Sequence, residues 1–346
     1  MLSLPHEVQF DVLKCLDFNQ LFSVKQANFY FCNLINKYEG RLARMKFHRV
    51  YIDRLFHLDI SFQYKHVKPQ SGVLEFTLSD KLKEKWQTAI NRSIPLFLNK
   101  FKSETTFISI TGVLNASDLA SRELNYALKL PTIPKNIEEM IIARCLLEQL
   151  FKCAFASLYF YDCIFNPEMI NILFDNDKTI PRQFNIKAAI LFDISNEIYE
   201  NVFNFVSNHL SISESLTFDF RDVDFTEKYA NILFNMLINE GNKIPKIKFS
   251  SYTLVWVYDF ITEYIATSKD CSKIIPLISF HFDNYPPFKL SERAEKVEIK
   301  QVDGKKHTNY QIANIYNPKV KYAFRNKETR HRRRFFNKVE IKRTRD

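Results

Sequence analysis

The amino-terminal forty residues place their apolar side chains at helical spacing. On what would be one face of a first helix, apolar residues recur every four positions: Leu4, Val8, Val12 and Leu16, with Leu13 beside them. The pattern predicts a helix from about residue 5 to residue 15. Pro5 suits its first turn, because the N–H that proline lacks would have no helical partner there and its fixed φ is already helical.

Two further helices are predicted in the same region. Asp17 followed by Gln20 indicates a capping box for a short second helix, with Leu21 and Val24 on its inner side. A third helix is predicted from an apolar stripe that ends before Gly40: Val24, Ala27, Phe31, Leu34 and Ile35. Three helices in ~40 residues bury too little apolar surface to be stable alone, so something else must cover them. Phe29 and Tyr30 lie off the stripe, where we expect a partner surface.

In order and spacing, these residues resemble the F-box, a helical docking module. The family pattern is Leu-Pro-x-Glu-hydrophobic, a paired aliphatic, Leu-Asp, and a final aromatic before Leu-Ile. The chain follows it with Ser3, Leu4, Pro5, His6, Glu7, Val8, Val12, Leu13, Leu16, Asp17, Leu21, Val24, Phe31, Leu34 and Ile35. Two positions depart from the pattern, since Ala27 and Phe31 stand where the family usually has Val and Trp. Both keep an apolar side chain.

The resemblance implies that residues 1–45 dock onto a Skp-type linker subunit. That linker holds a cullin scaffold and, through its RING partner, a ubiquitin-charged conjugating enzyme. The linker-binding residues implied are Leu4, Pro5, Glu7, Val8, Val12, Leu13, Leu16, Leu21, Val24, Phe29, Tyr30, Phe31, Leu34 and Ile35. The chain itself would do no bond chemistry, because it would act by bringing a target close to the charged enzyme. A plain three-helix start to an ordinary domain is the alternative.

Residues 46–135 are predicted to be a connecting region of mixed α/β structure. A helix is expected at about residues 80–91 and a strand at 106–110, and no function is assigned to them. Pro131 and Pro134 then punctuate the chain before a helical pattern that opens near Glu138.

A repeat emerges over residues 136–290. Strand-like segments begin at Leu158, Phe184, Leu216, Ile247 and Ile278, at spacings of 26, 32, 31 and 31 residues. Helical stretches are expected between them, at residues 166–175, 195–209, 226–240 and 254–267. The alternation predicts an α/β fold with a parallel sheet.

The first unit resembles a leucine-rich repeat in which Phe replaces several Leu. It runs Phe155, Leu158, Phe160, Cys163 and Phe165 at the spacing of that repeat, whereas later units lose the Asn/Cys position. We therefore expect an irregular, leucine-rich-repeat-like β-α solenoid. An F-box followed by such repeats also resembles large, expanded nematode F-box families.

Alternation along these strands predicts an open surface opposite the buried one, and we take it as the hypothesis for target binding. The residues expected on it are Tyr159, Tyr161, Thr217, Asp219, Lys248, Ser250, Ser279 and His281. The alternative is that they are ordinary solvated strand positions.

Composition excludes several functional classes. The chain has only five glycines, no two within 30 residues of each other, so a glycine-rich phosphate cradle cannot be written. Its six cysteines form no Cys-x-x-Cys pair and its eight histidines lack metal-ligand spacing, which excludes RING-type zinc sites. We expect no catalytic residue, metal or cofactor, and an unrecognised enzyme is the weakest interpretation.

The net charge of +10 is concentrated at residues 319–346, which contribute +9 of it through 12 Lys or Arg against three acids. We expect residues 291–346 to be a basic tail, solvated and disordered. The run at residues 330–334 offers the alternative of contact with nucleic acid, membrane phosphates or an import receptor. Neither a secretory signal nor a membrane helix is found in the sequence, so a cytoplasmic or nuclear protein is expected.

The sequence as a whole predicts a substrate-recognition adaptor of an SCF-type cullin-RING ubiquitin ligase, acting in ubiquitin-dependent protein degradation. The alternative is a protein-interaction scaffold that keeps an F-box-like helical module without assembling a ligase. Binding to the Skp-type linker distinguishes the two. The target protein cannot be read from the sequence.

Overall fold

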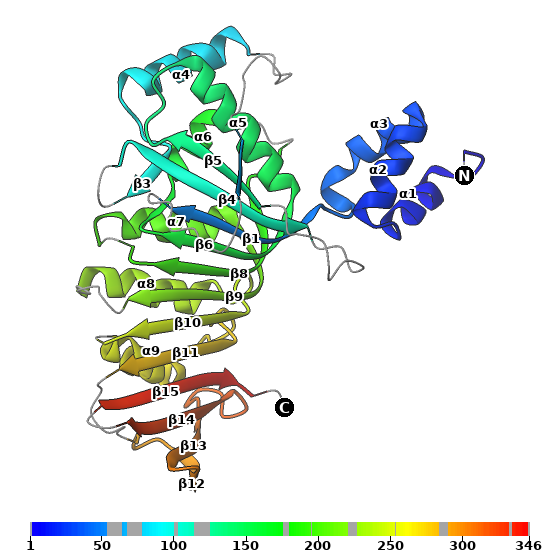
Figure 1. The fold of residues 1–346 in the computed structure, drawn as a ribbon. Coiled ribbons are helices and arrows are strands. Elements are labelled where there is room, and N and C mark those ends of the chain that lie inside the picture. Colours follow the sequence, from blue (N-terminus) through cyan, green and yellow to red (C-terminus); the bar gives the residue numbers. More distant parts are fainter. Residues whose placement is uncertain are drawn as a thin grey trace.

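The computed structural model describes residues 2–53, 64–67, 78–99, 103–113, 125–175, 180–194, 196–220, 227–252, 254–283, 290–331 and 334–344. It is a mixed α/β structure with two visibly different parts (Figure 1). A small helical module at the amino terminus stands to the side of a long, twisted sheet. Within the described ranges, no helix combines the length and apolarity that a membrane crossing needs.

The module consists of α1 (His6–Lys14), α2 (Phe18–Ala27) and α3 (Phe29–Lys37), followed by the 3-10 turn η1 (Glu39–Arg41). The predicted capping box is confirmed. The Asp17 carboxylate accepts a hydrogen bond from the Gln20 N–H at 2.9 Å, and the Gln20 side chain accepts one from the Asp17 N–H at 3.0 Å. Pro5 precedes α1 as its N-cap instead of lying in the first turn.

The predicted third helix is divided. Asn28 has an extended backbone (φ −154°), and its side chain accepts a hydrogen bond from the Tyr30 N–H at 2.8 Å, so it ends α2 and caps α3. Val24 and Ala27 therefore belong to α2 and not to the helix that carries Phe31. The apolar stripe crosses this break without interruption, which is why periodicity alone did not locate it.

One large sheet, counted over the described residues, takes thirteen strands in the order β12-β13-β14-β15-β11-β10-β9-β8-β6-β1-β4-β5-β2. Their bounds are β1 Lys46–Asp53, β2 Tyr64–Val67, β4 Thr105–Val113, β5 Asn125–Pro131, β6 Ala154–Tyr161, β8 Phe184–Phe192, β9 Leu210–Phe220, β10 Lys246–Ser251, β11 Leu277–Asp283, β12 Glu295–Val302, β13 Lys305–Ala313, β14 Lys321–His331 and β15 Arg334–Arg343. A small second sheet pairs β3 (Phe97–Asn99) with β7 (Cys163–Phe165).

The middle of the large sheet is parallel, as the repeat predicts. β1, β6, β8, β9, β10 and β11 are neighbours in register, and each predicted strand from Leu158 to Ile278 lies in one of them. The helices are α4 (Asp80–Asn91), α5 (Ile137–Lys152), α6 (Pro167–Phe174), α7 (Tyr199–His209, after the 3-10 turn η3 Asn196–Ile198), α8 (Glu227–Asn239) and α9 (Val255–Thr267). The alternation of strand and helix and the expected helix at residues 80–91 are confirmed.

The core follows the strands as ladders of large apolar side chains. One row of residues paired across the sheet is fully buried against the helices: Phe160, Leu191, Phe218, Phe249 and Phe280. Neighbouring rings stack, with centroids 5.9 Å apart for Phe218 and Phe249 and 5.4 Å apart for Phe249 and Phe280. The β-branched and aromatic content of the repeats thus builds one continuous interior.

The expectation of a solvated, disordered tail over residues 291–346 is wrong. β12 to β15 form an antiparallel meander, and β15 pairs with β11, so the meander extends the sheet. Its inward residues Phe324, Val339 and Ile341 are buried in the main core. The cations Arg325, Lys338 and Lys342 take positions next to these buried residues, so charge counted over the whole segment concealed a strand pattern of period two. Of the basic run at residues 330–334, residues 332 and 333 lie outside the described residues.

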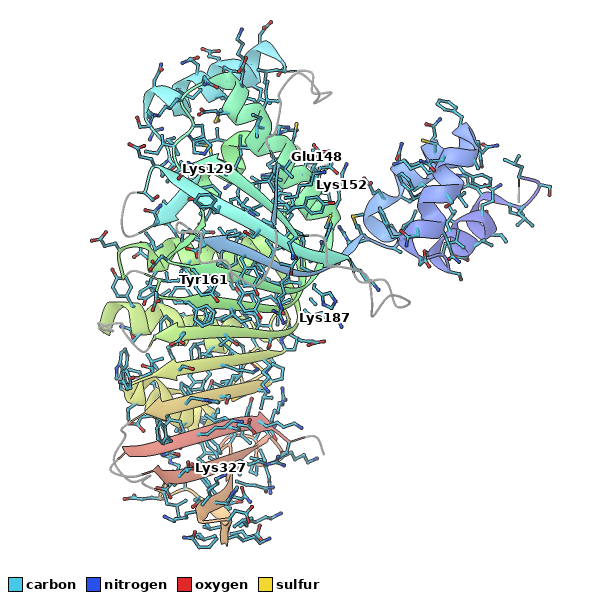
Figure 2. The ribbon with its side chains drawn as sticks, in the orientation of Figure 1. Lys129, Glu148, Lys152, Tyr161, Lys187 and Lys327 are labelled. Carbon is cyan, nitrogen blue, oxygen red and sulfur yellow. The ribbon has the colours of Figure 1, made fainter. Side chains whose placement is uncertain are left out.

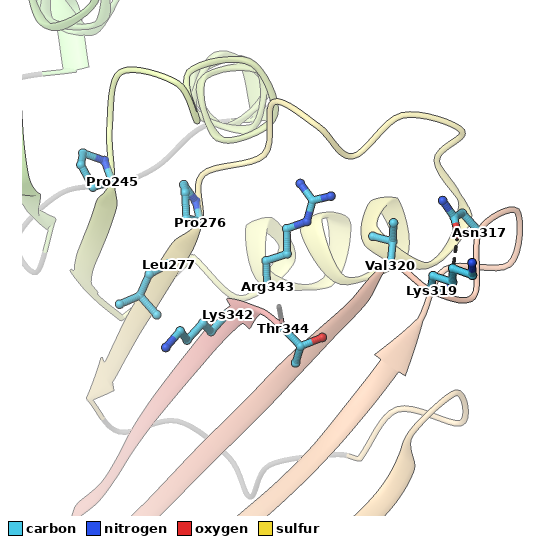
Figure 3. A pocket seen from close by; sticks show the side chains of 9 residues that line it. All are labelled: Pro245, Pro276, Leu277, Asn317, Lys319, Val320, Lys342, Arg343 and Thr344. Carbon is cyan, nitrogen blue, oxygen red and sulfur yellow. Dashed lines mark hydrogen bonds between the residues drawn. The ribbon is translucent and has the colours of Figure 1, made fainter. Parts of the chain in front are cut away.

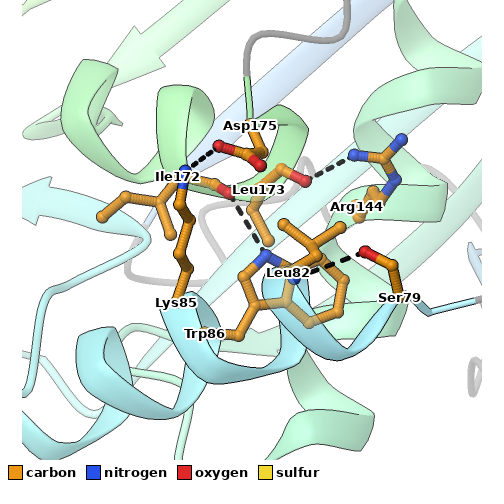
Figure 4. A network of polar contacts seen from close by, with 8 residues as sticks. All are labelled: Ser79, Leu82, Lys85, Trp86, Arg144, Ile172, Leu173 and Asp175. Atoms are coloured by element: carbon orange, nitrogen blue, oxygen red, sulfur yellow. Dashed lines mark hydrogen bonds and ion pairs between the residues drawn. The ribbon is translucent and has the colours of Figure 1, made fainter.

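Residues 46–135 share this sheet with the repeats, because β1 pairs in parallel with β6 and also in antiparallel with β4. α4 packs against α5 and α6, and polar contacts join both α4 and α5 to α6 (Figure 4). The Trp86 indole N–H donates to the Ile172 carbonyl at 3.2 Å, and the Arg144 guanidinium donates to the Leu173 carbonyl. These are carbonyls of the last turn of α6, which lack helical partners and need such donors.

Two candidate binding surfaces

The helical module has a small core of its own. Seven apolar residues form it: Phe10, Leu13, Leu21, Phe31, Leu34, Ile35 and Leu42. None of them belongs to the main core of the sheet. The three helices are therefore held together by their own side chains, and the sheet covers little of their surface (Figure 1).

Around this core, seven large apolar residues of the module are exposed, and we call them the exposed apolar set: Leu2, Leu4, Val8, Val12, Phe22, Phe29 and Tyr30. Phe29 is 81% exposed, the largest exposed fraction among the large apolar side chains that the structure describes. Val8 and Val12 lie four residues apart on α1, and Leu4 precedes the helix at the same spacing. Such a concentration of uncovered apolar surface is typical of a contact with another protein.

Gln9 connects two parts of this set. Its side chain is 3% exposed, and its amide N–H donates to the Leu4 carbonyl at 2.8 Å. Its carbonyl oxygen accepts a hydrogen bond from the Tyr30 hydroxyl at 2.7 Å. The residues ahead of α1 are thereby fixed against the start of α3. Sequence reasoning missed Gln9, although a polar residue between two apolar positions of α1 is the available signal.

The structure divides the predicted linker-binding residues into three groups. Leu4, Pro5, Glu7, Val8, Val12, Phe29 and Tyr30 are exposed, Leu16 and Val24 are half-buried, and Leu13, Leu21, Phe31, Leu34 and Ile35 are buried in the module core. The buried residues hold the helices together and offer little contact area to an outside protein. The exposed ones remain candidates for contact.

The module is joined to the sheet at the end of α5 (Figure 2). The Arg44 guanidinium donates to the Phe151 carbonyl at 2.7 Å, and Lys152 lies 3.2 Å from Glu39 and 3.1 Å from Glu148. Burial opposes the charge of Lys152, but hydrogen bonds and charges from Glu148 and Glu39 outweigh it and raise the pKa of Lys152. This contact is polar and small.

The second surface is the open face of the sheet. Helices α7, α8 and α9 lie against one face of β8 to β11, and the opposite face carries no helix (Figure 1). Along strand β6, buried Leu158 and Phe160 alternate with half-buried Ser157, Tyr159 and Tyr161 on the open side.

Aromatic rings gather at one end of this face, and we call them the aromatic patch: Tyr51, Tyr159, Tyr161 and Phe192. Ring centroids lie 4.7 Å apart for Tyr51 and Tyr159, and 4.8 Å apart for Tyr161 and Phe192, with planes nearly parallel. Burial raises the pKa of Tyr161, and the neighbouring tyrosines and carboxylates raise it further. Tyr51 and Phe192 were not predicted, because only the register across β1, β6 and β8 brings them beside the predicted tyrosines.

The predicted target-binding residues lie in two rows across the sheet. One row is Tyr159, Thr217, Lys248 and Ser279, with Ile190 between the first two, and the other is Tyr161, Phe192, Asp219, Ser250 and His281. All are half-buried or exposed on the open face except Ser279, which is only 1% exposed. Ser279 is short and is flanked by Lys248 and Glu340 in register, so longer side chains cover it.

A pocket of about 810 Å³ opens where β10 and β11 begin and β15 ends (Figure 3). Its lining includes the cations Lys319, Lys342 and Arg343 and no acidic residue. The side chains of Lys342 and Arg343 leave β15 in opposite directions, as successive strand residues do, and Lys342 belongs to the open face. In the part of the chain that the structure describes, no group of three or more His, Cys, Asp or Glu side chains could hold a metal ion.

A family model described as a domain of unknown function (DUF8381) matches residues 67–221. The match is less than half of the chain. It includes α4 to α7 and strands β4 to β9, with Tyr159 and Tyr161, and leaves out the helical module and the carboxy-terminal meander. Comparisons with curated proteins and with solved structures gave no match.

Proposed function

We propose that this chain is a substrate-recognition adaptor of an SCF-type cullin-RING ubiquitin ligase. In this role the F-box-like helical module docks a Skp-type linker, and the open face of the leucine-rich-repeat-like sheet holds a target protein. The observation that carries the proposal is the exposed apolar set on a module that contributes nothing to the main core. The order of motif residues from Leu4 to Ile35 supports the same function.

The physical reason for a partner is that so small a module leaves much of its apolar surface in water. Phe29 and Phe22 leave large parts of their rings in water, and covering an aromatic side chain removes ~150–250 Å² from solvent. An outside subunit that covers these rings gains that hydrophobic stabilisation, and the intramolecular hydrogen bonds of Gln9 hold Tyr30 in place for it.

The arrangement of the two surfaces suits an adaptor. The module is attached at the end of α5, and the open face extends away from it along the sheet (Figure 1). A target on that face and a linker on the module can be bound at the same time, because different elements hold them. Catalysis by the assembly would then depend on the raised effective concentration of the target near the conjugating enzyme.

Co-purification of the full chain with a co-expressed Skp-type linker tests the proposal. We expect a stable complex for the native chain. The double substitution Val8→Ser and Phe29→Ser should weaken binding at least ~30-fold, since exposed aromatic anchors of this kind contribute about 2 kcal/mol or more. Leu16 is left unchanged, because it packs against the module's own core.

The matched control is Val297→Ser with Ile299→Ser on β12, which removes similar apolar area from two exposed residues outside the module. This variant should bind the linker as the native chain does. The proposal fails if the native chain does not bind the linker, or if the module variant binds it as tightly as the control. The first of these results would favour an interaction scaffold that does not assemble a ligase.

A further inference from the structure

The meander builds a cluster of cations on the open face that sequence reasoning did not anticipate. We call it the basic patch, and it consists of Lys246, Lys248, Arg325, Lys327, Lys338 and Lys342, with the single carboxylate Glu340 among them. β10 supplies the first two, β14 supplies Arg325 and Lys327, and β15 supplies the rest. Figure 2 shows Lys327 well below Tyr161, toward the β12 edge of the sheet.

The register proves that these residues share one face. The row that contains Thr217 and Lys248 continues through Ser279 into Glu340 and Arg325. The row that contains Asp219 and Ser250 continues through His281 into Lys338 and Lys327. The predicted target-binding rows and the basic patch are therefore one continuous surface.

The positive charge of the patch is not neutralised within the described residues. Lys338 pairs with Glu340 at 2.8 Å, and no described carboxylate lies within ion-pair distance of the other five cations. The hydrogen bond from Lys338, together with the charges of Lys338, Lys246 and Arg325, lowers the pKa of Glu340. Burial, and then the charges of Lys246 and Lys338, lower the pKa of Lys248. A bound anion would relieve this repulsion.

We propose that the basic patch binds an extended acidic segment of a target polypeptide. Across the sheet, its cations span the three strand-to-strand spacings from β10 to β14, and along β15 they span about four residues. Both distances are roughly 14 Å. That area matches about four to six extended residues. A pocket of about 510 Å³, whose lining includes the cations Arg325, Lys342 and Arg343, leaves room for a carboxylate side chain among them. The inference rests on the proposed role of the open face in target binding.

A polypeptide fits this face better than a nucleic acid does. The row that contains Lys338 also contains Asp219, whose carboxylate would repel a continuous phosphate chain laid along it. The rings of the aromatic patch stack in two pairs, so one face of each ring is already occupied and fewer faces are left as platforms for bases. A polypeptide can place acidic residues over the cations and apolar residues over the ring edges.

Fluorescence anisotropy with the full chain tests the inference. The probe is a labelled twelve-residue peptide of alternating Glu and Ser, compared with a Lys-Ser peptide and a twelve-nucleotide oligouridylate. We expect the acidic peptide to bind most tightly, and raising the salt concentration should weaken it. Lys248→Glu with Arg325→Glu should weaken acidic-peptide binding at least tenfold, and the neutralising pair Lys248→Gln with Arg325→Gln should weaken it less.

The control is Lys81→Glu with Lys83→Glu on exposed positions of α4, which changes the net charge equally and should leave peptide binding unchanged. Circular dichroism checks that each variant is folded. Equal peptide binding by the patch variants and the native chain overturns the inference, as does tighter binding of the oligouridylate. Linker binding is measured separately, so peptide binding without linker binding would reject the adaptor and keep the acidic-peptide site.

Discussion

In the parallel strands, buried residues alternate with open-face residues and pack on helices, whereas the helical module exposes as many large apolar side chains as it buries. Seven residues form the module core and seven make up the exposed apolar set. The sheet, by contrast, joins its strands in one interior that runs from Val50 to Ile341. The two parts of the chain have similar apolar content and bury very different shares of it.

The difference follows from size and from geometry. A small unit has a large surface for its volume, so three short helices cannot enclose all their apolar residues. A sheet that adds β-α units encloses each new strand between neighbours, and the fraction buried stays high. Under the proposed function, uncovered apolar surface marks the contact region of the module, whereas charge and aromatic rings mark that of the sheet.

The largest effects are expected when one large side chain is removed from each core. Phe218→Ala should lower the free energy of unfolding of the sheet by about 3–5 kcal/mol, and Leu13→Ala should destabilise the module by about 2–5 kcal/mol. Urea denaturation measures the loss of unfolding free energy in each variant. Hydrogen exchange then shows which part of the chain has lost protection.

If the two cores are independent, Leu13→Ala should remove the exchange protection of α1 to α3 and leave β6 to β11 protected. Phe218→Ala should reduce protection throughout the sheet. Loss of protection in both parts from Leu13→Ala would show that the small polar contact at Arg44 and Lys152 couples them strongly, and the comparison would fail.

Smaller changes in stability are expected when one glycine from each part is replaced by alanine. A Cβ at Gly241 would lie 2.6 Å from the Lys273 carbonyl oxygen and closer still to that of Ile274, so Gly241→Ala should cost about 1–3 kcal/mol. A Cβ at Gly40 would meet no atom within 4 Å. Gly40→Ala should be neutral or stabilise the module by up to about 1 kcal/mol. Thermal melting of both variants checks this, and an equal loss at both positions would contradict it.

The smallest effect is a pH dependence that comes from the sheet. His209 is buried at the end of α7, its Nδ1 lies 2.9 Å from the Arg182 carbonyl oxygen, and burial lowers its pKa. A lowered pKa means that the unfolded state takes up a proton first. The stability present above pH ~6.5 should therefore be lost as the pH falls through the folded pKa.

Urea midpoints at pH 7.5 and 5.5 measure this effect. The stability difference between the native chain and His209→Asn should shrink at the lower pH. The substitution Gln26→Asn, at an exposed position of the module that does not titrate, is the control and should change the midpoint equally at both pH values. If the stability difference between the native chain and His209→Asn grew at the lower pH, the lowered pKa of His209 would be contradicted.

Much of the fold could be predicted from the sequence, because its strongest signals are periodic. Phe and Ile recur at alternate positions of strands spaced 31 or 32 residues apart, so β8 to β11 and the helices between them were expected. The capping box at Asp17 was likewise readable, since its geometry is local. The break at Asn28 was not, because an apolar stripe passes through it.

The surfaces were less predictable, since they depend on which strands become neighbours. Tyr51 lies over a hundred residues from Tyr159 in the chain and stacks on it only because β1 pairs with β6. The burial of Ser279 follows from Glu340, which β15 brings beside it. The basic patch was hidden for the same reason, since Arg325, Lys327, Lys338 and Lys342 looked like part of a solvated tail until the meander aligned them with β10.

The position of β15 between β11 and β14 gives the growing chain an assembly problem. β12, β13 and β14 are made before β15 and have no place in the sheet until β15 has paired with β11. At ~5–20 residues per second, the roughly fifty residues that separate β11 from β15 keep the edge of β11 open for ~3–10 s. An unpaired edge invites strands from other molecules, so aggregation during synthesis should depend on how quickly residues 334–343 arrive.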